Sequence, residues 1–352
     1  MEFSRILVRA TNWVGDAVMC VPALEALRAR YPKAHIAALA RPWVAGLYGK
    51  ELVDELIPYT TAKGWKELGA KRALAAELRG RNFDAAILLQ NAFEAAALVW
   101  MAGIPVRIGY ARDGRSALLT NRIAVPRTGE IPVHQRYYYL ELLRRAQIIS
   151  ALPKVDQIRL PGLQRLRSEG RSLLNARGWD KPMVGISPGS AYGTAKRWLP
   201  ERFAQSAVVL AQQLGAGVGV FGSSDETELC AAIVAQVQQA GVSASNFAGA
   251  TSLAEFVQLA AAAEVFLTND SGAMHIASAL GVPTVAVFGA TDHIATGPTG
   301  ALARIIREPV DCSPYPSPCL LRECPIDHRC MKAVSSDEVA GEAWDLVQLR
   351  RQ

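Results

Sequence analysis

Short apolar runs with strand character alternate with longer segments of helical periodicity along most of this chain, and this alternation constrains the fold more than any other feature. In the first half, amphipathic stretches at 23–31 and 66–81 separate three expected strands: Ile6–Val8, His35–Leu39 and Ala85–Leu89. An alternating order of strands and helices is typical of a parallel sheet whose strands are joined by crossover helices. The sequence therefore predicts an α/β fold.

The alternation weakens between residues 145 and 182 and then starts again. A second series of expected strands follows: Met183–Ser187, Gly217–Phe221, Val265–Thr268 and Thr284–Phe288. A chain of 352 residues is long enough for two domains with separate cores. We predict two doubly wound, Rossmann-like domains at 1–160 and 161–335, with a terminal helix at 336–352. Ligands of such sheets bind at the carboxyl ends of the strands, so we expect the site in a central cleft between the domains.

Positive charge is concentrated in the first 160 residues, which carry 23 Lys and Arg against 14 Asp and Glu. A basic half of this kind suits an anionic partner, such as a nucleic acid, an anionic lipid or a phosphorylated sugar. The cations are scattered, and no ladder of aromatic residues accompanies them, so we expect no binding of nucleic acid.

The first residues do not resemble a signal peptide, because Glu2, Arg5 and Arg9 bracket only a short apolar core. No apolar run approaches the ~20 residues that a membrane span needs. We therefore expect a cytoplasmic protein with at most a peripheral contact with a membrane.

Asp16 follows the first expected strand, at its junction with a helix. Gly15 is the only glycine in this loop, so the G-x-G-x-x-G fingerprint of dinucleotide-binding proteins is absent, which argues against a nicotinamide-dependent dehydrogenase. Two interpretations of Asp16 stay open from the residues alone. Its carboxylate can cap the helix by accepting backbone N–H bonds, or it can act as a general base at the cleft.

Three loops of the second domain also lie at expected strand ends. The loop at 188–198 is rich in small and hydroxylic residues and carries Lys196, which suits a phosphate, although a solvated loop with surface cations has the same composition. The loop at 268–275 precedes a helix whose first N–H groups are expected to point toward the cleft, where they can bind an anion. The alternative is that Asp270 only caps this helix and that His275 is only a core residue. Glu226 can bond ribose hydroxyls or simply favour the helix dipole.

Four cysteines are crowded into a Pro-rich segment at 311–331, namely Cys312, Cys319, Cys324 and Cys330. Disulfides are disfavoured in a cytoplasmic protein, and four thiolates can close a tetrahedral zinc site. The spacing lacks the C-x-x-C pair that marks such sites, so an iron–sulfur cluster and free thiols stay open as alternatives. We predict a structural zinc that orders the segment and takes no part in catalysis.

Taken together in chain order, the loops resemble a known enzyme family. The segments that carry the resemblance are Asn12–Asp16, Asn91–Phe93, Ala102–Pro105, Pro188–Gly189, Ala195–Trp198, Phe221–Ser223 and Thr268–Gly272 with His275. They are similar to those of the ADP-heptose:lipopolysaccharide heptosyltransferases, the inverting glycosyltransferase family nine with the GT-B fold. The likeness is greatest to the heptosyltransferase II members of that family.

The resemblance implies that the N-terminal domain binds the acceptor, the heptose-bearing inner core of Kdo-lipid A, and that the C-terminal domain binds ADP-heptose. Asp16 is then the catalytic base, and Arg112 and Arg115 lie in a loop suited to anionic groups of the acceptor. Eight residues fall in donor-binding segments of the family: Ser190, Thr194, Lys196, Glu226, Asp270, Ser271, Gly272 and His275. The paired threonines of some members are missing, which weakens the assignment of Ser190 and Thr194.

The same resemblance implies a single inverting displacement that requires no cofactor, since the donor loops lack a metal-binding D-x-D signature. It also implies peripheral contact with the cytoplasmic face of the inner membrane, where the acceptor is anchored. Two alternatives stay open. One is a relative that uses another nucleotide sugar or core position, and the other is a nucleotide-binding relative that has lost turnover.

Overall fold

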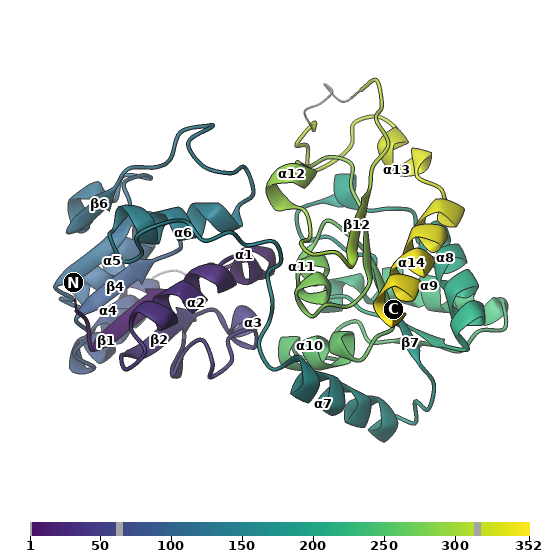
Figure 1. The fold of residues 1–352 in the computed structure, drawn as a ribbon, viewed down its shortest axis with the longest axis horizontal. Helices are drawn as coiled ribbons and strands as arrows, with labels where there is room; N and C mark the ends of the chain where they lie inside the picture. The colour runs from purple at the N-terminus through teal and green to yellow at the C-terminus, as the bar shows by residue number, and fades with distance from the viewer. Residues whose placement is uncertain (1, 61–65, 313–317) are drawn as a thin grey trace. The chain divides into compact units, whose positions relative to one another are not determined.

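The structure is a computed structural model that describes residues 2–60, 66–312 and 318–352. The chain divides into two compact units, Met1–Val155 and Asp156–Gln352. Each unit is a six-stranded parallel sheet with helices packed on it, so the predicted α/β architecture is confirmed (Figure 1). Within the described residues, no helix combines the length and the apolar character that crossing a bilayer requires.

The first unit has strand order β3-β2-β1-β4-β5-β6. Its strands are β1 (Arg5–Arg9), β2 (His35–Ala40), β3 (Glu55–Pro58), β4 (Ala85–Leu88), β5 (Val106–Tyr110) and β6 (Asn121–Ile123). Its helices are α1 (Val14–Met19), α2 (Val21–Arg30), α3 (Pro42–Ala45), α4 (Lys66–Gly80), α5 (Phe93–Met101) and α6 (Arg136–Arg145). The order reverses direction between β1 and β4, and a ligand of a doubly wound sheet binds at that reversal. The loop that carries Asp16 leaves β1 at this position.

The central strands form because their residues are apolar on both faces. In β1, Ile6, Leu7 and Val8 are all buried, and β1 pairs in parallel with β2 on one side and with β4 on the other. A strand covered by helices on both faces has a continuous apolar run instead of an alternating one. This is why the sequence predicts these strands directly.

The second unit repeats the arrangement with strand order β12-β11-β10-β7-β8-β9. Its strands are β7 (Met183–Ser187), β8 (Gly217–Val220), β9 (Ala244–Asn246), β10 (Val265–Asn269), β11 (Thr284–Val287) and β12 (Ala303–Ile306). Its helices are α7 (Leu163–Ala176), α8 (Pro200–Leu214), α9 (Thr227–Gln239), α10 (Leu253–Ala261), α11 (Gly272–Ala279), α12 (His293–Thr296), α13 (Arg329–Ala333) and α14 (Ser336–Arg351). The reversal lies between β7 and β10, so the loops at 188–198 and 268–275 meet there.

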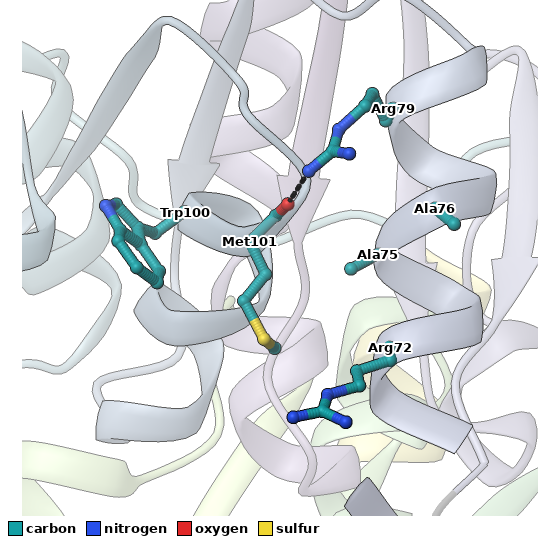
Figure 2. Close-up of a pocket in the computed structure, with 6 residues that line it drawn as sticks. All are labelled: Arg72, Ala75, Ala76, Arg79, Trp100 and Met101. Atoms are coloured by element: carbon teal, nitrogen blue, oxygen red, sulfur yellow. Dashed lines mark hydrogen bonds between the residues drawn. The ribbon is translucent and has the colours of Figure 1, made fainter. Parts of the chain in front are cut away.

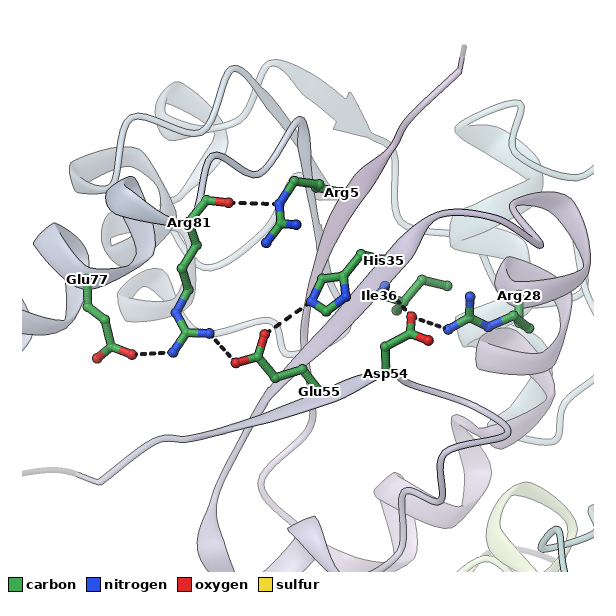
Figure 3. A network of polar contacts seen from close by, with 8 residues as sticks. All are labelled: Arg5, Arg28, His35, Ile36, Asp54, Glu55, Glu77 and Arg81. Atoms are coloured by element: carbon green, nitrogen blue, oxygen red, sulfur yellow. Dashed lines mark hydrogen bonds and ion pairs between the residues drawn. The ribbon is translucent and has the colours of Figure 1, made fainter.

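Two surface features of the first unit lie away from the strand ends that carry Asp16. An open pocket lies between α4 and α5 (Figure 2). A polar network joins the amino ends of β1, β2 and β3 (Figure 3). In this network Glu55 lies 3.1 Å from His35 and also bonds Arg81, while Asp54 accepts bonds from the Ile36 N–H at 2.7 Å and from Arg28 at 2.6 Å.

Candidate active site

Asp16 lies in the first turn of α1, directly after the carboxyl end of β1. The N-cap position is occupied by Trp13, which makes no side-chain cap bond, so the interpretation of Asp16 as the N-cap is wrong. Its Oδ1 instead accepts a hydrogen bond of 2.9 Å from the hydroxyl of Tyr139, a residue of α6. Two segments 123 residues apart in the chain therefore fix the direction of this carboxylate.

The surroundings of Asp16 are largely neutral. Burial raises the pKa of Asp16, and the hydrogen bond from Tyr139 offsets part of that rise. Burial also raises the pKa values of the Tyr139 hydroxyl and the Cys20 thiol well above their ordinary range, so both stay protonated at neutral pH. A half-buried carboxylate with a raised pKa is a suitable acceptor for a proton.

Cations gather near the carboxyl ends of the strands in the first unit. The guanidinium carbons of Arg9 and Arg41 both lie 4.4 Å from the centre of the Tyr59 ring. Arg9 is buried, and it donates to the carbonyl of Ala10 at 2.5 Å and to Oδ1 of Asn12 at 3.0 Å. Burial lowers the pKa of Arg9 to about 10, so it remains charged at neutral pH. The local potential is thus positive, which suits an anionic ligand.

The two arginines of the loop after β5 have different environments. Arg115 is fully buried, and it donates to the carbonyls of Tyr110, at 2.9 Å, and Gln90, and to Oδ1 of Asn91 at 3.0 Å. These bonds show that Arg115 fastens the loops after β4 and β5 to each other. Arg112 is exposed, so of the two it is the arginine that can contact an anion in solution.

In the second unit, Lys196 and Asp270 lie together although they are 74 residues apart in the chain. The Lys196 ammonium donates to Oδ2 of Asp270 at 2.5 Å, and the hydroxyl of Thr291 donates to the same oxygen at 2.5 Å. Lys196 also lies 4.7 Å from the centre of the Tyr192 ring. The strand ends at the sheet reversal thus hold a cation beside the N-terminus of α11, a position that favours a phosphate.

The remaining predicted donor residues lie on the same loops. Ser190 is buried, whereas Thr194 is exposed in a short 3₁₀ turn that ends at Lys196. Ser271 is the N-cap residue of α11, and Gly272 and the buried His275 belong to its first turns. Glu226 forms a capping box with Ser223 and packs on Gly189 so closely that a Cβ there would lie 2.0 Å from its Oε1.

The model of glycosyltransferase family 9 (heptosyltransferase) matches residues 71–328. This chain belongs to glycosyltransferase family 9. Lipopolysaccharide heptosyltransferase 2 of Escherichia coli strain K12 is 35% identical to it over 311 residues, which cover 86% of this chain and 88% of that protein. The enzyme of the same name from Salmonella typhimurium is 35% identical over 312 residues. The predicted family is therefore confirmed.

Solved structures agree with this assignment. The structure of E. coli ADP-heptose lps heptosyltransferase II has a TM-score of 0.80 and 30% identity, and the match covers 99% of this chain and 100% of that one. A family 9 structure from Veillonella parvula also has a TM-score of 0.80, at 22% identity, which bears on the fold alone. The predicted GT-B fold is confirmed, and the chain is a heptosyltransferase of the lipopolysaccharide core.

The structure of this family 9 member does not support the predicted zinc site. Among the described residues, no group of three or more His, Cys, Asp or Glu side chains is placed to hold a metal ion; residues 313–317 of the cysteine-rich segment lie outside them. Cys312 is exposed, and Cys319, Cys324 and Cys330 are half-buried.

Two residues of the site were missed by sequence reasoning. Tyr139 belongs to a Tyr-rich helix whose composition indicates only packing, and nothing in the sequence pairs it with Asp16. Asn269 is buried at the end of β10, where it donates to the carbonyl of Pro188 at 2.6 Å and accepts from the N–H of Trp198 at 2.9 Å. A polar residue that ends a fully buried strand is the signal that could have identified Asn269.

Proposed function

We propose that this enzyme transfers heptose from ADP-heptose to the first heptose of the lipopolysaccharide inner core, as heptosyltransferase II does, in one inverting displacement. The observation that carries the proposal is the likeness to heptosyltransferase 2 proteins across nearly the whole chain. The geometry of both units supplies groups with the chemistry that this reaction needs.

In the first unit, Asp16 acts as the general base. As the acceptor oxygen forms its bond to the anomeric carbon, the hydroxyl proton passes to the Asp16 carboxylate and the bond from that carbon to the ADP oxygen breaks. The raised pKa of Asp16 makes it a stronger base than an exposed carboxylate, while Tyr139 keeps it oriented. Exposed Arg112 and the cations near Tyr59 support an acceptor that carries carboxylate and phosphate groups.

In the second unit, Lys196 and the N–H groups of α11 stabilise the negative charge that develops on the departing ADP. Lys196 then exchanges its bond to Asp270 for the phosphate oxygens. Ser190, Thr194, Ser271, Gly272 and His275 line the phosphate side, and Glu226 receives the ribose hydroxyls. Because Lys196 and the helix N-terminus supply positive charge, we propose that transfer requires no divalent cation.

The acceptor is anchored in a bilayer through its lipid A part, so we place the enzyme in the cytoplasm in peripheral contact with the inner membrane. We propose no nucleic-acid partner. The donor, ADP-heptose, is a small soluble molecule.

Mass spectrometry of reaction products tests this function. Purified protein is given ADP-heptose together with acceptors truncated before and after the first heptose. One added heptose on the heptose-bearing acceptor alone is expected, and the anomeric configuration of the product, measured by NMR, reports inversion. Transfer to the heptose-free acceptor would indicate another core position, transfer only from other nucleotide sugars would indicate another donor, and ADP binding without any transfer would indicate a non-catalytic relative.

A further inference from the structure

The outer surface of the first unit carries an open groove between α4 and α5 (Figure 2). We call it the α4–α5 groove; it has a volume of about 490 Å³ and is lined by Arg72, Ala75, Ala76, Arg79, Trp100 and Met101. The four α4 residues recur at helical spacing, so they form one stripe on that helix. Arg79 and Arg72 lie toward opposite ends of the stripe, and Met101 and Trp100 lie across from it on α5.

The two arginines of the groove, Arg72 and Arg79, have no ion-pair partner among the described residues, whereas neighbouring cations do. Neighbouring cations are paired: Lys71 lies 2.6 Å from Glu67 and 3.5 Å from Glu94, and Arg81 lies 2.7 Å from Glu77. No carboxylate of the described residues forms an ion pair with Arg72 or Arg79. Arg79 donates one bond, of 2.5 Å, to the carbonyl of Met101, and its side chain lines the groove.

Large apolar side chains are exposed on α4 and α5, the two helices that form the groove. Trp100 is 54% exposed, and Phe93, seven residues earlier on the same face of α5, is 53% exposed. Leu68 precedes Arg72 by one helical turn and is also 54% exposed. Of these side chains Trp100 lines the groove itself, and an exposed apolar side chain beside unpaired cations is a feature of interaction surfaces.

We propose that the α4–α5 groove is the membrane-docking surface of this enzyme and that it takes the headgroups of acidic phospholipids. Unpaired guanidinium groups bind phosphate oxygens well, and Trp is favoured at the interface between headgroups and acyl chains. The excess positive charge of this half of the chain adds long-range attraction to an anionic surface. The proposal rests on the proposed function only in that a lipid-anchored acceptor requires the enzyme to reach a bilayer.

Flotation with lipid vesicles tests the proposal. The full-length protein is mixed with vesicles of phosphatidylglycerol and phosphatidylethanolamine, and with neutral phosphatidylcholine vesicles as the comparison. The wild type is expected to float with the acidic vesicles only. Arg72→Glu with Arg79→Glu should weaken that binding roughly 10- to 100-fold. Trp100→Ser, which leaves the charges in place, should weaken it on its own.

A matched control keeps the charge change but moves it elsewhere. Arg122 and Arg127 are exposed in the same unit and lie outside the α4–α5 groove. Arg122→Glu with Arg127→Glu should therefore retain most of the vesicle binding. An equal loss in the control would overturn the proposal, because binding would then depend on net charge alone. A different result would also overturn the proposal. If sedimentation shows that the wild type is a dimer, and Trp100→Ser makes it a monomer without any loss of vesicle binding, the groove binds a second copy of the chain instead.

Transfer assays separate this proposal from the proposed function. The Arg72→Glu/Arg79→Glu variant should transfer heptose to a deacylated, water-soluble acceptor at the wild-type rate, and should lose most transfer to acceptor held in acidic vesicles. Loss of transfer to both acceptors, with unchanged vesicle binding, would refute the docking role. A wild type that binds acidic vesicles but transfers no heptose would instead refute the proposed function.

Discussion

At the scale of single residues, Asp16 offers the sharpest test of the chemistry. Asp16→Asn keeps the size and the hydrogen bond from Tyr139 but cannot accept the proton. Transfer should fall roughly 10²- to 10⁴-fold, the usual size of a general-base contribution, while ADP affinity and thermal stability stay close to wild type. Steady-state kinetics, calorimetry with ADP and thermal melting measure the three quantities. A variant with near-normal turnover would mean that another group removes the proton.

Tyr139 should act on the reaction through the pKa of Asp16. Tyr139→Phe removes a bond that lowers this pKa, so the pKa of Asp16 rises further and the acid limb of kcat/KM moves to higher pH. Turnover at neutral pH should also fall, roughly 10-fold, because the carboxylate loses its orientation. The groups that face Asp16 besides Tyr139 include Cys20, which stays neutral.

Tyr137→Phe is the matched control, since the Tyr137 hydroxyl lies in the same helix but accepts a bond from the N–H of Val155. Its pH profile should match that of the wild type. An unshifted profile in Tyr139→Phe, or the same shift in both variants, would show that the bond to Asp16 does not set the profile.

Lys196 and Asp270 should be coupled in donor binding. Lys196→Ala should weaken ADP binding by ~1.5 to 3 kcal/mol, the usual worth of a hydrogen bond to a charged group, and it also leaves the Asp270 carboxylate uncompensated beside the phosphates. Adding Asp270→Asn removes that repulsion, so the double variant should bind ADP more tightly than Lys196→Ala alone. Titration calorimetry on the four proteins gives the coupling energy. Strictly additive losses would place Lys196 and Asp270 in separate roles.

At the scale of elements, what the sequence predicted depends on burial. Seven interior strands, β1, β2, β4, β7, β8, β10 and β11, appear in the sequence as continuous apolar runs. The interior strand β5 was not predicted, because it carries Arg107 and its first two residues are only half-buried. The edge strands β3, β6, β9 and β12 were not predicted either: they are short and partly exposed, and β9 has no fully buried residue. An edge strand is covered on fewer sides, so its sequence carries little periodic signal.

The network at the amino ends of β1 to β3 should make the first unit sensitive to acid (Figure 3). The bond from Arg81 lowers the pKa of Glu55. Burial acts to raise the pKa of Asp54, but the bonds from the Ile36 N–H and from Arg28 outweigh burial, so the pKa of Asp54 is also lowered. Carboxylates with lowered folded pKa values contribute stability above their unfolded pKa values near 4, and this contribution is lost as pH falls through the folded values. The free energy of unfolding should therefore decline below about pH 4, and Glu55→Gln should flatten that decline. An identical pH slope in Glu55→Gln would exclude this network as a source of acid sensitivity.

At the scale of the whole molecule, the sequence predicted where the candidate residues lie in the fold but not which contacts they make. The strand-end rule placed Asp16, Lys196 and Asp270 at the carboxyl ends of strands, and the structure has them there, beside the reversal in each sheet. The contact of Asp16 with Tyr139 could not be predicted, because a hydrogen bond across 123 residues leaves no local pattern. The predicted zinc site has no support among the described residues, since spacing along the chain does not determine how the four cysteines lie relative to one another.

The last prediction follows from the proposal that the first unit binds the acceptor and the second unit binds ADP-heptose. If ADP binds only the second unit, saturating ADP should slow amide hydrogen exchange in the loops at 188–198, 222–227 and 268–275. At 100 times its dissociation constant a ligand adds about 2.7 kcal/mol to the stability of the state that it binds. This stabilisation slows only those amides whose exchange requires the ADP-binding unit to unfold. If the two units unfold separately, amides of β1, β2 and β4 in Met1–Val155 should exchange at an unchanged rate. Exchange resolved by peptide, with and without ADP, measures both sets. Protection concentrated around Asp16 would place the nucleotide in the first unit, and equal protection throughout would mean that the two units unfold as one.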